Sequence, residues 1–258
     1  MRLNLPDQLK RRPAPRQANF AGYVADLRES AERDGIVVYF DLDRTLISGY
    51  SITALALEAL WSGYLSPRQV ITHAGIFLGY GLGRANYHDL LTSTVQALVG
   101  IQEEEMIDLG QNAFDNRLAA LVFEEARILI DVHKEKGHEV VMMTSATRYQ
   151  AEPVARDLGI DNMCCTELEI ISGRLAGIAH LCYGESKKVA ADRYALDRQV
   201  DLNNAFFYSD SSEDLPLLEA VGRPVAANAK STLAKVAQAK GWTQLAFVTQ
   251  GESRPIAA

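Results

Sequence analysis

The feature that most constrains the fold is a series of short apolar segments that alternate along the chain with segments of helical pattern. Five of these segments are GIVVYF, EVVMMTSAT, MCCTELEI, AFFYS and PVAAN, and ISGRLAG predicts a turn that leads into a further short strand. Apolar runs of this length, rich in β-branched and aromatic residues, are typical of buried strands. Strands that alternate with helices predict an α/β fold with a doubly wound, mostly parallel sheet, whose ligands bind at the carboxyl ends of the strands.

A long helical insertion is predicted between the first two strands. Residues 47–121 show helical patterns without a clear strand signal, so we expect them to form a separate all-helical unit. Residues 35–46 and 122–258 are then expected to form the core that carries the sheet. Within the core, residues 124–136 predict a helix that ends at Gly137.

Residues 1–34 are expected to form an N-terminal extension. Pro13 and Pro15 interrupt its first part, and apolar residues at helical spacing predict a helix from Phe20 to Arg33. The simplest interpretation is a solvated arm followed by a docked helix. Contact between the basic residues of the arm and an acidic lipid surface is the alternative.

The overall charge argues against a nucleic-acid-binding protein. The net charge is −7 and the pI is about 5.3, whereas affinity for nucleic acid rests on clustered Lys and Arg residues. Charged residues such as Glu58 and Arg68 interrupt the most apolar stretch well short of the roughly 18 residues that a membrane span needs. We therefore expect neither a nucleic-acid partner nor a transmembrane segment.

The cysteines and the N-terminal residues favour a cytoplasmic protein. Cys164 and Cys165 are adjacent and Cys182 stands apart, which gives neither a disulfide framework nor a zinc-ligand spacing. Reduced thiols are therefore expected, with a cysteine nucleophile as the less favoured alternative. The first residues are basic but lack the apolar core of a signal peptide.

Polar residues that phosphoryl transfer requires follow three of the predicted strands. Asp41 and Asp43 follow the first strand, Thr144 ends the second, and Asp210 and Asp214 follow AFFYS. A single Asp in such a place is usually a helix cap or a turn former. Their shared position at strand ends makes a joint role in catalysis the better interpretation.

These residue types suit the hydrolysis of a phosphate monoester. A carboxylate such as Asp41 can attack phosphorus and form an aspartyl phosphate. Asp43, if the backbone kinks after the strand, can protonate the leaving oxygen and later activate water. Mg²⁺ prefers carboxylate oxygens, so Asp41 and Asp210 are candidate ligands.

A second set of residues is predicted to hold the phosphate group. Thr144 can donate a hydroxyl hydrogen bond to a phosphoryl oxygen, and Ser145 follows it in the same loop. Lys187 can supply a positive charge. The alternative for Lys187 is an ordinary surface lysine beside Lys188.

These motifs resemble those of the haloacid dehalogenase (HAD) superfamily. FDLDRTL resembles its DxDxT signature, VVMMTSAT its second motif, CYGESKK its third, and YSDSSEDLPLLE, with its DxxxD pair, its fourth. All four occur in the expected order within residues 36–228. The helical insertion resembles the C1 cap of subfamily IB, the phosphoserine phosphatase-like branch, which has a Rossmann-like core.

The resemblance implies a role for each matching position. Its metal ligands correspond to Asp41, the main-chain carbonyl of Asp43, and Asp210, with Thr45 and Asp214 in supporting positions. Two positions differ from the pattern. Phosphoserine phosphatases carry a Glu where this chain has Tyr50, which argues against phosphoserine as substrate, and a Gly usually stands where this chain has Ser209.

The sequence therefore predicts a Mg²⁺-dependent phosphatase that acts on a small-molecule phosphomonoester. A phosphotransferase or mutase could use the same site, and a non-catalytic binding protein of the same fold is a further alternative. Aromatic residues of the insertion are mostly expected in its core, although some could line a pocket for a substrate with an apolar group; they are Trp61, Tyr64, Phe77 and Tyr80. Arg84 and Tyr87 are expected at the surface, with contact to a substrate anion as the alternative.

Overall fold

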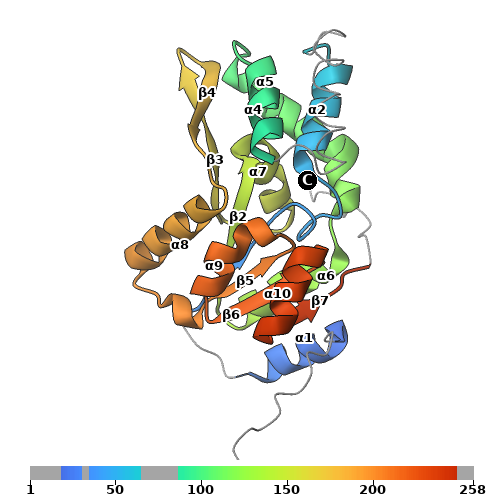
Figure 1. The fold of residues 1–258 in the computed structure, drawn as a ribbon. Coiled ribbons are helices and arrows are strands. Elements are labelled where there is room, and N and C mark those ends of the chain that lie inside the picture. Colours follow the sequence, from blue (N-terminus) through green and yellow to red (C-terminus); the bar gives the residue numbers. More distant parts are fainter. Residues whose placement is uncertain (1–18, 31–34, 65–86, 249–258) are drawn as a thin grey trace, which may run out of the picture.

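The computed structural model describes residues 19–30, 35–64 and 87–248. Its centre is a seven-stranded sheet with the order β4-β3-β2-β1-β5-β6-β7 (Figure 1). The strands are β1 (Val37–Phe40), β2 (Glu139–Thr147), β3 (Asn162–Ile171), β4 (Arg174–His180), β5 (Phe206–Ser209), β6 (Arg223–Ala227) and β7 (Thr243–Leu245). Every pair is parallel except β3–β4. The predicted mostly parallel α/β sheet is confirmed, and β7 is a strand that the sequence did not predict.

Helices cover both faces of the sheet. They are α1 (Phe20–Glu29), α2 (Ser51–Trp61), α4 (Tyr87–Ala97), α5 (Glu103–Ala113), α6 (Glu124–Glu135), α7 (Arg148–Asp157), α8 (Glu185–Arg198), α9 (Leu215–Ala220) and α10 (Ser231–Lys240). The apolar residues of α1, α6 and α7 share one core with one face of the sheet. Those of α8, α9 and α10 pack in a second core on the other face.

The two cores explain why the strands are apolar at successive positions. In β1, Val38 and Phe40 belong to the first core, while Val37 and Tyr39 belong to the second. Successive side chains of a strand point to opposite faces, so a strand covered on both faces has no solvent-facing position. The continuous apolar run that predicted a buried strand therefore reflects two helical layers.

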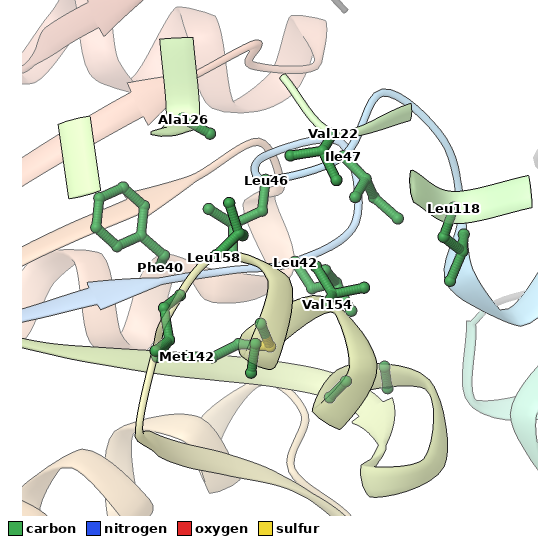
Figure 2. Close-up of a cluster of buried hydrophobic side chains, with 14 of the residues drawn as sticks. Phe40, Leu42, Leu46, Ile47, Leu118, Val122, Ala126, Met142, Val154 and Leu158 are labelled. Carbon is green, nitrogen blue, oxygen red and sulfur yellow. The ribbon is translucent and has the colours of Figure 1, made fainter. Parts of the chain in front are cut away.

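The segment after β1 is anchored by apolar side chains. Figure 2 shows Leu42, Leu46 and Ile47 in one cluster with Val122 and Leu118, and all five are fully buried. Burial of each large apolar side chain contributes about 1.5–3 kcal/mol. This packing fixes the backbone on which the neighbouring acidic residues are carried.

The described part of residues 47–121 is helical, as predicted. Its helices α2, α4 and α5 lie together at the end of the molecule to which the β3–β4 pair extends (Figure 1). A Cβ atom at Gly110 of α5 would lie 2.0 Å from the main-chain oxygen of Tyr149, so glycine lets α5 approach α7 closely. Trp61 is 77% exposed, so it does not belong to a core of the described residues.

Several predicted positions lie outside the described residues. They are the arm of residues 1–18, and Phe77, Tyr80 and Arg84 with the side chain of Tyr87. The first helix was predicted to reach Arg33, but α1 ends at Glu29 and the backbone of Ser30 is extended. In the described part of the chain, no helix combines the length and the apolar composition needed to cross a bilayer.

A buried polar network ties α1 to the sheet. The hydroxyl of Tyr23 in α1 lies 2.8 Å from the hydroxyl of Tyr208 in β5. The same Tyr208 hydroxyl lies 2.8 Å from His133 Nε2, and His133 Nδ1 lies 2.9 Å from His138 Nδ1. Burial and the neighbouring His138 lower the pKa of His133 to about 3. The network therefore requires a neutral imidazole in the folded protein.

This network predicts a loss of stability at acidic pH. The unfolded chain binds a proton at His133 below about pH 6.5, whereas the folded chain does not bind it until about pH 3, so the free energy of unfolding falls as pH falls through that window. In His133→Gln this dependence should be weaker by up to about 1.4 kcal/mol per pH unit. Urea unfolding of both proteins between pH 7 and pH 4.5 measures the two slopes, and equal slopes would contradict the assignment.

Candidate active site

The backbone turns sharply directly after β1. The N–H of Asp41 donates to the Tyr208 oxygen at 3.0 Å and extends the pairing with β5. The carbonyl oxygen of Leu42 then accepts hydrogen bonds from the amides of the next turn, and Arg44 has a left-handed backbone with φ 62°. The backbone therefore kinks after the strand, as the role expected of Asp43 requires.

Asp43 is oriented by the first residue of α2. The Ser51 N–H donates to Asp43 Oδ1 at 2.7 Å, at the helix end that favours negative charge. Burial raises the pKa of Asp43 to about 6, although the hydrogen bonds from Ser51 lower it. Asp43 Oδ2 is buried without a hydrogen-bond partner among the described residues. This carboxyl group therefore has one oxygen fixed and one available.

Lys187 joins two of the predicted acidic residues. It lies in the first turn of α8, and its Nζ is 2.7 Å from Asp41 Oδ1 and 2.9 Å from both carboxylate oxygens of Asp214. Lys187 is only 2% exposed. Burial lowers its pKa, but the two carboxylates raise the pKa above its ordinary value. The surface-lysine alternative is thus wrong for Lys187, whereas Lys188 pairs with Asp192 near the surface.

Asp210 is held by two cations that the sequence analysis did not identify. Its Oδ2 accepts a hydrogen bond from Arg44 Nε at 2.9 Å and lies 3.6 Å from Lys230 Nζ. Burial raises the pKa of Asp210, while Lys230 and Arg44 oppose that rise. Nearby, Ser209 donates to Asp214 Oδ2 at 2.7 Å, so the serine at the usual glycine position helps to fix this acidic residue.

One cavity brings most of the predicted residues together. Six of them line it: Asp41, Asp43, Ser145, Lys187, Asp210 and Asp214. The other lining residues are Tyr50, Tyr183, Ser211, Glu213 and Lys230. Thr144 and Thr45 are buried beside the cavity without lining it, and Thr144 Oγ1 accepts a hydrogen bond from the Ala146 N–H at 3.0 Å.

A second, larger cavity lies beside β3 and α8. Its volume is about 530 Å³, whereas the cavity lined by the predicted residues has a volume of about 40 Å³. The larger cavity contains none of the predicted site residues. Its apolar walls carry both acidic and basic side chains, including Glu167 and Arg193. We therefore take the smaller cavity as the candidate active site, because the predicted acidic residues and Lys187 meet there, although its volume is smaller.

The charges of the smaller cavity suit a divalent cation. Five carboxyl groups line it against two lysines. Burial raises the pKa of Asp41, and Asp214 and Asp210 raise it further despite Lys187. The described residues contain no cluster of three His, Cys, Asp or Glu side chains in a metal-binding arrangement. A site built from two carboxylates and the main-chain carbonyl of Asp43 requires no such cluster, so the residues present fit Mg²⁺.

Several known proteins are similar to this chain in sequence or in fold. The sequence model of haloacid dehalogenase-like hydrolases matches residues 38–219. A probable phosphatase of Mycobacterium tuberculosis is 31% identical over 231 residues, which cover 88% of this chain and 79% of that protein. A histidinol-phosphatase of Neisseria meningitidis is 29% identical over 221 residues, which cover 81% and 97%. A solved structure of phosphoserine phosphatase, which contains an analogue of the phospho-aspartyl intermediate, is similar in fold, with a TM-score of 0.62. The two chains are 18% identical, and the match covers 84% of this chain and 96% of that chain.

Removal of the Lys187 charge should destabilise the protein strongly. Lys187→Met leaves Asp41 and Asp214 buried without their counter-charge, which typically costs about 3–5 kcal/mol. Lys188→Met is the matched control and should change the stability little, because its ion pair is solvent-exposed. Urea unfolding at pH 7 without added metal measures the stability of both variants. The difference in stability between the two variants should shrink at pH 5, because burial raises the pKa of Asp41 and a protonated Asp41 needs no counter-charge. Equal stability of the two variants at pH 7 would refute the role of the ion pair.

Proposed function

Because the chain belongs to the haloacid dehalogenase-like hydrolase family, we propose that it is a Mg²⁺-dependent phosphatase that cleaves a small-molecule phosphomonoester through an aspartyl phosphate. The observation that carries this proposal is the placement of Lys187 between Asp41 and Asp214 in a cavity that Asp43 also lines. A nucleophile, an acid and a phosphate-binding cation thereby share one enclosed space.

In the proposed binding step, the phosphoryl group enters the cavity beside Lys187 and Ser145. Lys187 supplies positive charge, and the Ser145 hydroxyl can donate to a phosphoryl oxygen. Magnesium, bound by Asp41, Asp210 and the Asp43 carbonyl, would neutralise the anionic oxygens that otherwise repel a nucleophile. Thr144 supports this loop from beneath through the Ala146 amide.

In the proposed chemical steps, a carboxylate oxygen of Asp41 attacks phosphorus as the bond to the alcohol oxygen breaks. Asp43 transfers its proton to the leaving alcohol oxygen. Asp43, now ionised, removes a proton from the water that attacks the aspartyl phosphate, which releases inorganic phosphate and restores Asp41. The hydrogen bond from Ser51 holds Asp43 Oδ1, so Oδ2 is the oxygen that exchanges the proton.

We further propose that residues 47–121 act as a cap over a core formed by residues 35–46 and 122–258. Tyr50, at the start of this insertion, lines the cavity together with Tyr183. Two phenol rings suit a substrate with an apolar or aromatic portion better than a small ammonium group. We place the protein in the cytoplasm because its three cysteines are free thiols.

Release of inorganic phosphate tests this function directly. The substrates are aryl, sugar, glycerol, lipid and nucleotide phosphates, with phosphoserine and histidinol phosphate because relatives carry those names. Release should require Mg²⁺, stop in EDTA, and fall roughly 10³-fold or more in Asp41→Asn. Transfer to added glycerol in place of water would identify a phosphotransferase. If none of the substrates releases phosphate, the proposal that the protein is a phosphatase is wrong.

The role of Asp43 predicts a dependence on the leaving group. Asp43→Asn should slow the hydrolysis of alkyl phosphates by about 10²–10⁴-fold, because a poor leaving group needs the proton. With p-nitrophenyl phosphate the first step needs no proton donor, but the second step still lacks its base. Quenched-flow measurements should therefore show a rapid burst of p-nitrophenol, close to one equivalent of enzyme, before slow turnover. Equal slowing of both substrates without a burst would contradict this role.

A further inference from the structure

Asn228 connects two distant parts of the chain beside the site. It follows β6 and has a left-handed backbone, with φ 49°, which Asn adopts more readily than most residues. Its N–H donates to the Leu245 oxygen at 2.9 Å, and its Oδ1 accepts from the Phe247 N–H at 2.7 Å. Its Nδ2 donates to the Arg44 oxygen at 3.0 Å. One side chain thus joins the segment after β7 to the turn after β1.

The segment after β7 is a firm anchor for Asn228. Phe247 is buried, and its ring packs edge-to-face on Phe20 of α1 and on Phe123 before α6, with centroids 5.8 and 5.6 Å away. The Val248 N–H donates to Glu125 Oε1 at 2.9 Å. Because α1 and the start of α6 hold this segment, the amide of Asn228 is fixed in place and can restrain the residue that it contacts.

That residue is Arg44, which connects Asn228 to Asp210. Its left-handed backbone, with φ 62°, is disfavoured for a residue with a side chain and persists only where neighbours hold it. Its N–H donates to the Gly49 oxygen at 3.2 Å, and its carbonyl accepts the Asn228 hydrogen bond. Its guanidinium donates to Asp210 Oδ2 at 2.9 Å. The orientation of the Arg44 side chain therefore depends on a turn that Asn228 restrains.

We propose that Asn228 is a positioning residue for the metal side of the site. It holds the Arg44 turn, and the Arg44 guanidinium then orients the Asp210 carboxylate; Asn228 does not line the cavity and touches no reacting group. Arg44 and Lys230 both contact Oδ2, so a metal ion bound through Oδ1 would leave both contacts in place. The inference rests on the proposed function, because it takes Asp210 as a Mg²⁺ ligand.

Two substitutions separate the hydrogen bonds of Asn228. Asn228→Gly keeps the left-handed backbone accessible and removes both side-chain bonds. Asn228→Asp keeps the acceptor for the Phe247 N–H but places an oxygen against the Arg44 carbonyl. Gln199→Gly is the matched control, because Gln199 is exposed at the end of α8 and has a similar left-handed backbone, with φ 56°.

Calorimetric titration with Mg²⁺ alone, without substrate, is the main measurement. Loss of a partner behind a metal ligand typically weakens metal binding about 10–100-fold, so we expect at least a tenfold higher Kd in both Asn228 variants. Gln199→Gly should match the wild type. Thermal unfolding in EDTA tests whether the variants are folded. At saturating Mg²⁺, the KM for the best phosphomonoester should remain unchanged, which a general loss of structure would not produce.

A double-mutant cycle tests the route through Arg44. If Asn228 acts through the guanidinium, Asn228→Gly should weaken Mg²⁺ binding little further in an Arg44→Gln background. Additive effects would overturn this route, and wild-type affinity in Asn228→Asp would show that the Arg44 bond is unimportant. A wild-type protein that neither binds Mg²⁺ nor releases phosphate would overturn the proposed function together with this inference. Wild-type binding that is unchanged in both Asn228 variants would overturn the inference alone.

Discussion

The ion pair of Lys187 with Asp41 and Asp214 is the interaction on which the site depends. All three groups are almost completely buried, and an unpaired charge in that position would be strongly destabilising. The three residues come from α8, the end of β1 and the loop after β5, so the pair forms only when all three elements are in place. The fold and the charge arrangement of the candidate active site are therefore stabilised together.

The sheet order brings these charges to one edge of the sheet. β1 lies between β2 and β5, and its parallel neighbours bring their carboxyl ends to the same edge. Apolar side chains on either side of Asp43, chiefly Leu42 and Leu46, are fully buried and hold the loop from below. The carboxyl groups are left to face one another in the cavity, where their repulsion favours the binding of a divalent cation.

The sequence predicted those features that arise from local pattern. Apolar runs identified five of the strands, and the acidic residues that follow two of them identified four of the residues that line the cavity. Ser145 and Lys187, predicted as phosphate-binding residues, line it as well. β7 was missed because it has three residues and only one of them, Leu245, is fully buried. The contacts of Arg44 with Asp210 and of Asn228 with Arg44 were also missed, since they join residues 166 and 184 positions apart and leave no periodic signal.

The left-handed turn at Arg44 shows why such distant contacts are needed. The left-handed backbone of Arg44, directly after Asp43, turns the chain from β1 toward α2, but this conformation is unfavourable for any residue with a Cβ atom. Local sequence alone cannot hold it, so the restraint must come from elements that fold against the loop. Asn228 and the segment around Phe247 provide it, which makes the short C-terminal strand part of the support of the active site, although it contributes no reacting group.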